Sequence, residues 1–204
     1  MESFDLYKDI ATRTGGDIYI GVVGPVRSGK STFIKKFMDL MVLPNIENEH
    51  VRQRATDELP QSAAGKTIMT TQPKFIPNEA VNITVDGEAK CRVRMVDCVG
   101  YMVEGAMGFT EFEAPRMVTT PWFEGEIPFI QAAEIGTKKV IDEHSTIGII
   151  VTTDGSITDI PRAAYVNAEE KVVGELDNLG KPYVIVINSA NPNSDEAAAL
   201  KEKL

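Results

Sequence analysis

Residues 18–31 read IYIGVVGPVRSGKS, and this stretch decides the fold class of the chain. The apolar run at 18–23 predicts a buried strand, which leads into the motif GPVRSGKS at 24–31. A strand, a glycine-rich turn and a following helical pattern define a P-loop, whose backbone N–H groups surround phosphate oxygens. The helix that begins near Lys30 directs its positive end at the same anion. We therefore predict a site for a nucleoside triphosphate.

Individual P-loop residues have distinct predicted roles. Lys30 is expected to reach the β- and γ-phosphates, and Ser31 is expected to ligate Mg²⁺. Arg27 lies inside the loop, so charge stabilisation during hydrolysis is one hypothesis for it and a solvent-exposed arginine is the alternative. The predicted nucleotide contacts of this region are Gly24, Arg27, Ser28, Gly29, Lys30, Ser31 and Thr32.

A second motif, MVDCVG at residues 95–100, is an apolar strand that ends in Asp-x-x-Gly. In P-loop hydrolases, an aspartate at this place holds Mg²⁺ through water, and the glycine N–H meets the γ-phosphate. We predict these roles for Asp97 and Gly100. Many GTPases carry a glutamine after the glycine that orients the attacking water. Tyr101 stands there and cannot do so, which leaves the water-positioning group unidentified.

Thr70 and Thr71 precede the second expected strand. Switch-type hydrolases place a threonine here, whose hydroxyl reaches Mg²⁺ and whose N–H reaches the γ-phosphate. Both residues are candidates for this sensing role, and the alternative is that they only enter a strand. With them, the predicted catalytic residues are Lys30, Thr70, Thr71 and Asp97, and the predicted metal ligands are Ser31, Thr70 and Asp97.

The base pocket is expected after the last strand, where the chain reads NSAN at 188–191. GTPases of this layout carry Asn-Lys-x-Asp there, and the aspartate accepts two hydrogen bonds from guanine. Asn188 matches, but Ser189 replaces the lysine and Asn191 replaces the aspartate. Charged hydrogen bonds of this kind are worth about 1.5–3 kcal/mol each, so guanine preference is lost. We predict an adenine nucleotide.

Composition restricts the function classes. The chain has 204 residues, 43% hydrophobic and 25% charged, with a formal net charge of −9. This acidic balance argues against a nucleic-acid partner. No stretch approaches about 20 apolar residues, and the N-terminus lacks signal-peptide features. Cys91 and Cys98 are expected to stay reduced, as in a cytoplasmic protein. His50 and His144 have no metal-ligand spacing and are expected to be surface polar residues.

The expected fold class is α/β, a three-layer P-loop domain with a mostly parallel sheet. Asp86-Gly87 predicts a hairpin, which makes one strand antiparallel. Residues 45–72 and 101–129 are expected to be long loops, the first with a short helix near 49–58. Strands are expected at 18–23, 81–85, 92–96, 146–152 and 183–187, and helices at 30–42, 130–143, 163–179 and 195–204. The apolar stripe of the first helix is expected to comprise Phe33, Ile34, Phe37, Met38 and Met41, and Trp122 is expected to be either a contact patch or a buried anchor.

Four blocks identify a resemblance. FDLYKDIATRTGGDIY at 4–19, DELPQSAAGKTIMTT at 57–71, VDCVGY at 96–101 and HSTIG at 144–148 closely resemble the stage IV sporulation protein A family. This is the family of spore coat morphogenetic ATPases of endospore-forming bacteria. The resemblance covers nearly the whole chain and becomes weaker after residue 189.

The resemblance implies a domain related to translation-factor-class GTPases that uses ATP and Mg²⁺. It implies that residues 1–204 are an N-terminal ATPase domain of a longer protein. The pattern of elements leads to the same expectation, because a complete fold of this type has one more strand and helix after the last expected helix. It also implies self-association into filaments in the full-length protein, and hydrolysis linked to assembly of the coat basement layer. Other spore coat morphogenetic proteins are implied partners. The implied location is the mother-cell cytoplasm at the outer forespore membrane, reached through regions outside these residues.

Two other functions remain open from the residues alone. One is a GTPase switch of the ribosome-assembly type, against which the unmatched base motif argues. The other is a structural protein that binds nucleotide without turnover, which the missing glutamine after Gly100 keeps possible.

Overall fold

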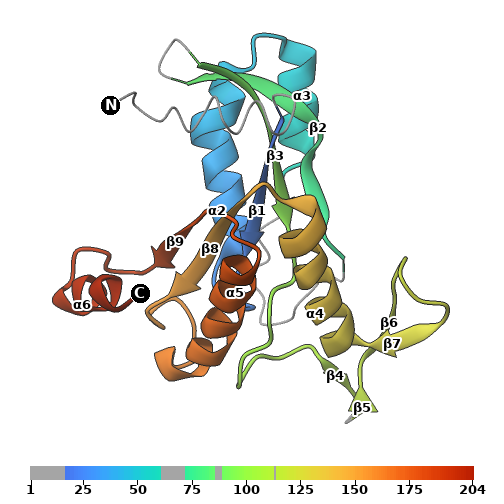
Figure 1. The fold of residues 1–204 in the computed structure, drawn as a ribbon, viewed down its shortest axis with the longest axis vertical. Coiled ribbons are helices and arrows are strands. Elements are labelled where there is room, and N and C mark those ends of the chain that lie inside the picture. Colours follow the sequence, from blue (N-terminus) through green and yellow to red (C-terminus); the bar gives the residue numbers. More distant parts are fainter. Residues whose placement is uncertain (1–16, 61–71, 86–88, 113) are drawn as a thin grey trace.

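The computed structural model describes residues 17–60, 72–85, 89–112 and 114–204 (Figure 1). Its central sheet has the strand order β2-β3-β1-β8-β9. Strand β1 pairs in parallel with β3 and β8, β8 pairs in parallel with β9, and β2 is antiparallel to β3. The predicted mostly parallel sheet with one antiparallel strand is confirmed. The strands are β1 (Asp17–Val23), β2 (Lys74–Val85), β3 (Ala89–Asp97), β8 (Ile147–Thr153) and β9 (Tyr183–Asn188).

Helices cover both faces of this sheet and make three layers, as Figure 1 shows. Ile34 and Met38 pack with Ile20 of β1 on one face, and Phe129 and Val172 pack with Val96 of β3 on the other. The first face is covered by α2 (Lys30–Phe37), η1 (Met38–Val42), η2 (Leu43–Asn45) and α3 (Glu49–Asp57). The second face is covered by α4 (Phe129–Lys139), η3 (Val140–His144), η4 (Arg162–Tyr165) and α5 (Val166–Asn178).

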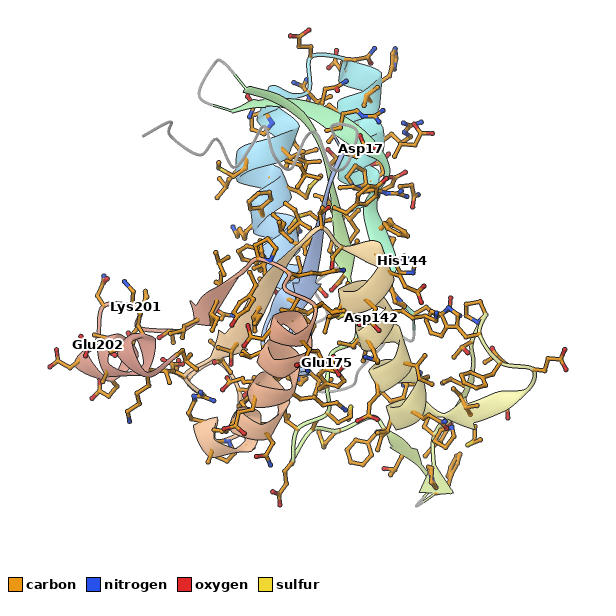
Figure 2. All side chains as sticks on the ribbon, viewed as in Figure 1. Asp17, Asp142, His144, Glu175, Lys201 and Glu202 are labelled. Carbon is orange, nitrogen blue, oxygen red and sulfur yellow. The ribbon has the colours of Figure 1, made fainter. Side chains whose placement is uncertain are left out.

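The last helix, α6 (Asp195–Lys203), lies beyond the β9 edge of the sheet, where Figure 2 labels Lys201 and Glu202. The Ser194 hydroxyl accepts a hydrogen bond from Ala197 N at 3.2 Å, so the predicted N-cap is confirmed. Within the described residues, no helix has the length and apolar character needed to cross a membrane.

Two expectations about local structure need correction, and a third cannot be compared with the structure. Met41 is 55% exposed, and Val42 instead continues the buried stripe of Ile34 and Met38. The chain changes from an α-helix to the wider π-helix η1 at Met38, which moves the buried face by one position. Strand β2 begins at Lys74, not near 81, with a register shift between Ile76 and Val81. The predicted turn at 86–87 lies outside the described residues.

The segment expected to be a loop at 101–129 instead contains two small antiparallel sheets. Strand β4 (Thr110–Glu111) pairs with β5 (Ala114–Pro115), and β6 (Met117–Thr119) pairs with β7 (Glu126–Pro128). These strands are too short to give a periodic pattern that sequence reading can detect. Trp122 lies between β6 and β7, half-buried against α4.

Candidate functional site

The predicted phosphate loop joins β1 to α2 at the edge of the sheet where the parallel strands end. Arg27 and Gly29 both have positive φ, 63° and 97°. A Cβ atom on Gly29 would lie 2.2 Å from Asn188 Nδ2, so only glycine fits this position. Phe33 N donates to Gly29 O at 2.8 Å and begins the helical pattern of α2. The loop therefore has the turn-into-helix conformation that a phosphate site needs.

Lys30 is held inside this loop. Its side chain is buried, and Nζ donates to the carbonyl oxygen of Pro25 at 2.6 Å, with Gly24 O at 3.5 Å. Burial lowers the pKa of the Lys30 amine, while the neighbouring Cys98 and Asp97 raise it. A buried cation whose partners among the described residues are two carbonyl oxygens is well suited to receive a multiply charged anion.

Asp97 ends β3 beside the first turn of α2. Ser31 Oγ donates to Asp97 Oδ2 at 2.7 Å. Burial raises the pKa of the Asp97 carboxyl, against the hydrogen bond from Ser31 and the charge of Lys30, which lower it. Asp97 Oδ1 and Ser28 Oγ are buried and find no hydrogen-bond partner among the described residues. Unpaired buried oxygens are costly, so their presence here fits a site completed by Mg²⁺ and nucleotide.

The loop after β3 is joined directly to the P-loop. Val26 N donates to Tyr101 O at 2.8 Å, and Tyr101 N donates to Gly24 O at 3.2 Å. Gly100 has φ +96°, and a Cβ there would lie 2.5 Å from Lys30 Nζ. Glycine is therefore required beside the amine. Burial raises the pKa of the Cys98 thiol to about 11, so this neighbour of Lys30 stays neutral.

The predicted base-pocket segment also reaches the P-loop. Asn188 Nδ2 donates to Ser28 O at 3.1 Å. Ser189, which stands where GTPases have lysine, donates its hydroxyl to Asp154 Oδ2 at 2.5 Å. Ser156 Oγ donates to Asp154 Oδ1 at 2.5 Å and accepts from Ala190 N at 2.9 Å. The loop after β8 thus fixes the segment after β9.

The predicted site residues that the structure describes lie on the P-loop and the first turn of α2, at and just after the end of β3, and at the end of β9. The structure brings together Gly24, Ser28, Gly29, Lys30, Ser31, Asp97, Gly100 and Asn188. Arg27 is half-buried in the same loop, and Thr32 is exposed on α2. Thr70 and Thr71 lie outside the described residues.

Sequence reasoning missed two residues of this region. Thr137 of α4 accepts a hydrogen bond from Gly100 N at 3.0 Å, and Asp154 arranges the segment after β9. Thr137 lies within an amphipathic helix far along the chain, where no local pattern distinguishes it. Asp154 had a usable signal, because it follows the end of a buried parallel strand.

The family described as stage IV sporulation protein A, ATPase domain, matches residues 1–204. The chain belongs to this family. A stage IV sporulation protein A of Bacillus anthracis is 62% identical over 204 residues, and one of Bacillus subtilis is 61% identical over 204 residues. One of Clostridioides difficile is 56% identical over 200 residues, 98% of this chain. The first two alignments cover 100% of this chain but 42% of each relative's length, and the third covers 41%.

Membership of this ATPase-domain family agrees with the site geometry. The family name indicates a nucleotide-binding domain of a sporulation protein. Lys30, Ser31 and Asp97 form the part of the site where such a nucleotide's phosphates are expected.

Proposed function

We propose that this chain binds ATP with Mg²⁺ and hydrolyses it to ADP and phosphate. The observation that carries the proposal is the group of Lys30, Ser31 and Asp97, in which Lys30 and Asp97 are buried and Asp97 Oδ1 has no hydrogen-bond partner among the described residues. Burying such a group without a ligand costs free energy. A nucleotide with its metal ion would supply the missing charges and hydrogen bonds.

Each residue has a proposed role in this reaction. Lys30 binds the β- and γ-phosphates, and the N–H groups of Gly29 and its neighbours orient them. Ser31, Asp97 and Thr70 hold the Mg²⁺ ion and its waters. When bound, this ion supplies electrostatic stabilisation of the charge that develops on the phosphate oxygens. Gly100, together with Thr70 and Thr71, senses the γ-phosphate. The proposed nucleotide contacts are Gly24, Arg27, Ser28, Gly29, Lys30, Ser31, Thr32, Gly100 and Asn188.

Preference for adenine is proposed from the segment after β9. A guanine pocket of the usual type needs a carboxylate at the position of Asn191, which carries an amide. Ser189 is engaged by Asp154 and presents no long aliphatic chain to cover a purine ring. Both features support ATP over GTP.

Slow turnover is part of the proposal. The Tyr101 hydroxyl donates to Glu175 of α5 at 2.5 Å, and Lys171 Nζ lies 4.2 Å from the Tyr101 ring centroid. Burial raises the pKa of this phenol, so it stays protonated and bound to Glu175. Tyr101 therefore does not orient an attacking water, and hydrolysis at a low rate suits a conformational switch.

The biological setting is proposed from the family. We propose that residues 1–204 are the N-terminal ATPase domain of a longer protein, related to translation-factor-class GTPases. Hydrolysis then drives self-assembly into the basement layer of the spore coat, alongside other coat morphogenetic proteins. The assembly lies in the mother-cell cytoplasm on the forespore membrane surface, which regions outside this chain contact. The net charge of −9 supports the absence of a nucleic-acid partner.

Phosphate release from ATP and from GTP, measured side by side with Lys30→Ala as the control, tests the proposal. We expect ATP turnover that the substitution removes, with GTP a poor substrate. Preferential GTP turnover would favour a ribosome-assembly type of switch. ATP binding without phosphate release would indicate a structural nucleotide-binding protein.

A further inference from the structure

The N–H group of Gly100 is engaged by a side chain that the proposed reaction does not use. Gly100 N donates to Thr137 Oγ1 at 3.0 Å, and Thr137 has no solvent exposure. On its other side, Gly100 approaches Lys30, since a Cβ built on it would lie 2.5 Å from Nζ. One peptide group thus lies between the phosphate-binding amine and a hydroxyl of α4.

We propose that Thr137 is a positioning residue, which holds the Gly100 N–H on α4 until a γ-phosphate replaces its hydroxyl as the acceptor. This inference rests on the proposed ATPase function. A charged phosphate oxygen is a stronger acceptor than a neutral hydroxyl. ADP has no γ-phosphate, so it leaves the Gly100–Thr137 hydrogen bond in place. Because a ligand shifts an equilibrium only by its differential affinity, this exchange separates the ATP state from the ADP state.

The local backbone permits this exchange. Gly100 has φ +96° and no Cβ, so its peptide can rotate without the steric cost that another residue would meet. The N–H is buried, so it needs an acceptor in both states. Thr137 supplies that acceptor when no γ-phosphate is present.

Helix α4 connects the exchange to two other segments. A Cβ on Gly136, next to Thr137, would lie 3.2 Å from Pro73 Cδ and 3.4 Å from Trp122 Cη2. Pro73 immediately precedes β2 and closely follows the proposed sensing threonines. The amine of Lys139 lies 5.9 Å from the Trp122 ring centroid. Movement of α4 on loss of the Thr137 hydrogen bond would therefore reach the segment at 72–73 and the β6–β7 hairpin.

The test compares Thr137→Val, which removes the acceptor at constant shape, with Thr137→Ser, which keeps it. Dissociation constants are measured for ADP and for the non-hydrolysable analogue AMP-PNP, both with MgCl₂. In Thr137→Val the Gly100 N–H loses the Thr137 hydroxyl as its acceptor in the ADP state, so the ratio of the ADP constant to the AMP-PNP constant rises about 10-fold. Thr137→Ser keeps the ratio of the unaltered chain. An unchanged ratio in Thr137→Val, or equal weakening of both nucleotides, overturns the inference.

A second measurement needs no substitution at Thr137. In a chain labelled with ¹⁵N-glycine, we expect the Gly100 amide resonance to shift with AMP-PNP and to stay near its nucleotide-free position with ADP. Trp122 is the single tryptophan of the sequence, and its fluorescence should change with AMP-PNP only. Equal responses to both nucleotides overturn the positioning role of Thr137 but leave the ATPase proposal standing. No binding of either nucleotide overturns both.

Discussion

Lys30 and Lys181 lie at opposite ends of the parallel strands, and their amines have different surroundings. Lys181 donates to the carbonyl oxygens of Ile141, Asp142 and Ser145, the last two at 2.9 and 2.8 Å. Ile141 and Asp142 belong to η3, the last turn of the continuous α4–η3 helix, so this amine caps the C-terminal end of that helix. Among the described residues, Lys30 Nζ instead has one short contact, to Pro25 O, and one long contact, to Gly24 O.

The difference lies in how completely each amine is paired. An ammonium group has three N–H donors, and Lys181 places them on three backbone oxygens. Burial lowers the pKa of both amines. Around Lys30, however, Ser28 Oγ and Asp97 Oδ1 are buried without hydrogen-bond partners among the described residues. Incomplete pairing, more than burial itself, is the feature that separates the candidate site around Lys30 from the contacts of Lys181.

The same substitution at the two lysines gives the largest contrast. Lys30→Met is expected to weaken AMP-PNP binding about 10³-fold, because the amine's charged contacts to two phosphates are lost. Its effect on the unfolding free energy of the nucleotide-free chain should be smaller than that of Lys181→Met. Calorimetric titration and urea unfolding measure the two quantities. Retained tight binding in Lys30→Met would contradict the assignment of the phosphate site.

Asp97→Asn tests the metal side of the same group. We expect ATP turnover to fall about 100-fold, about 2.7 kcal/mol, because an amide cannot hold the Mg²⁺ waters as a carboxylate does. Nucleotide binding should change much less, since Lys30 and the P-loop N–H groups remain. Asp142→Asn, in η3 at the opposite end of the parallel strands, is the matched control for loss of a carboxylate. Normal turnover in Asp97→Asn would refute the role of Asp97.

Lys181→Met tests the structural member of the pair. Loss of three charge-assisted hydrogen bonds at a helix end is expected to lower the unfolding free energy by about 2 kcal/mol. For a chain of this size, that corresponds to a decrease in Tm of about 4–8 °C. Thermal unfolding of Lys181→Met is compared with that of Lys201→Met, whose side chain is exposed on α6. Equal Tm values for the two variants would show that the Lys181 contacts add no stability.

Much of the sheet, and the grouping of residues in the candidate site, could be predicted from the sequence, because both depend on local patterns. Apolar runs predict the parallel strands, and the side chains that follow their carboxyl ends lie on the same side of the sheet. This rule brings Lys30, Asp97 and Asn188 together from distant parts of the chain. The spacing of GPVRSGKS then restricts the ligand chemistry.

The parts that could not be predicted depend on three-dimensional contacts or on very short elements. Thr137 is recognisable only once α4 is packed against the loop after β3. Met41 is exposed because the chain changes to a π-helix at Met38, and the apolar periodicity of the sequence does not predict that change. The β4–β7 strands carry too few residues to show alternation.

Substitution of Arg27 is expected to have the smallest effect of the changes considered, and it tests a single residue of the P-loop. It has φ +63°, a conformation that is unfavourable for any side chain with a Cβ, yet glycine is not used here. Arg27 also helps to line a cavity of about 160 Å³ with Met107 and Thr158. If its guanidinium stabilises charge during hydrolysis, Arg27→Ala should lower kcat about 10-fold, about 1.4 kcal/mol, with little change in KM.

Arg27→Gly separates that effect from backbone strain. Glycine relieves the positive φ, so this variant should be more stable than Arg27→Ala while losing the same kcat. Arg27→Lys keeps a positive charge and should recover part of the rate. An unchanged kcat in both Arg27→Ala and Arg27→Gly would place Arg27 with Lys181, as a residue that shapes the fold and takes no part in the chemistry.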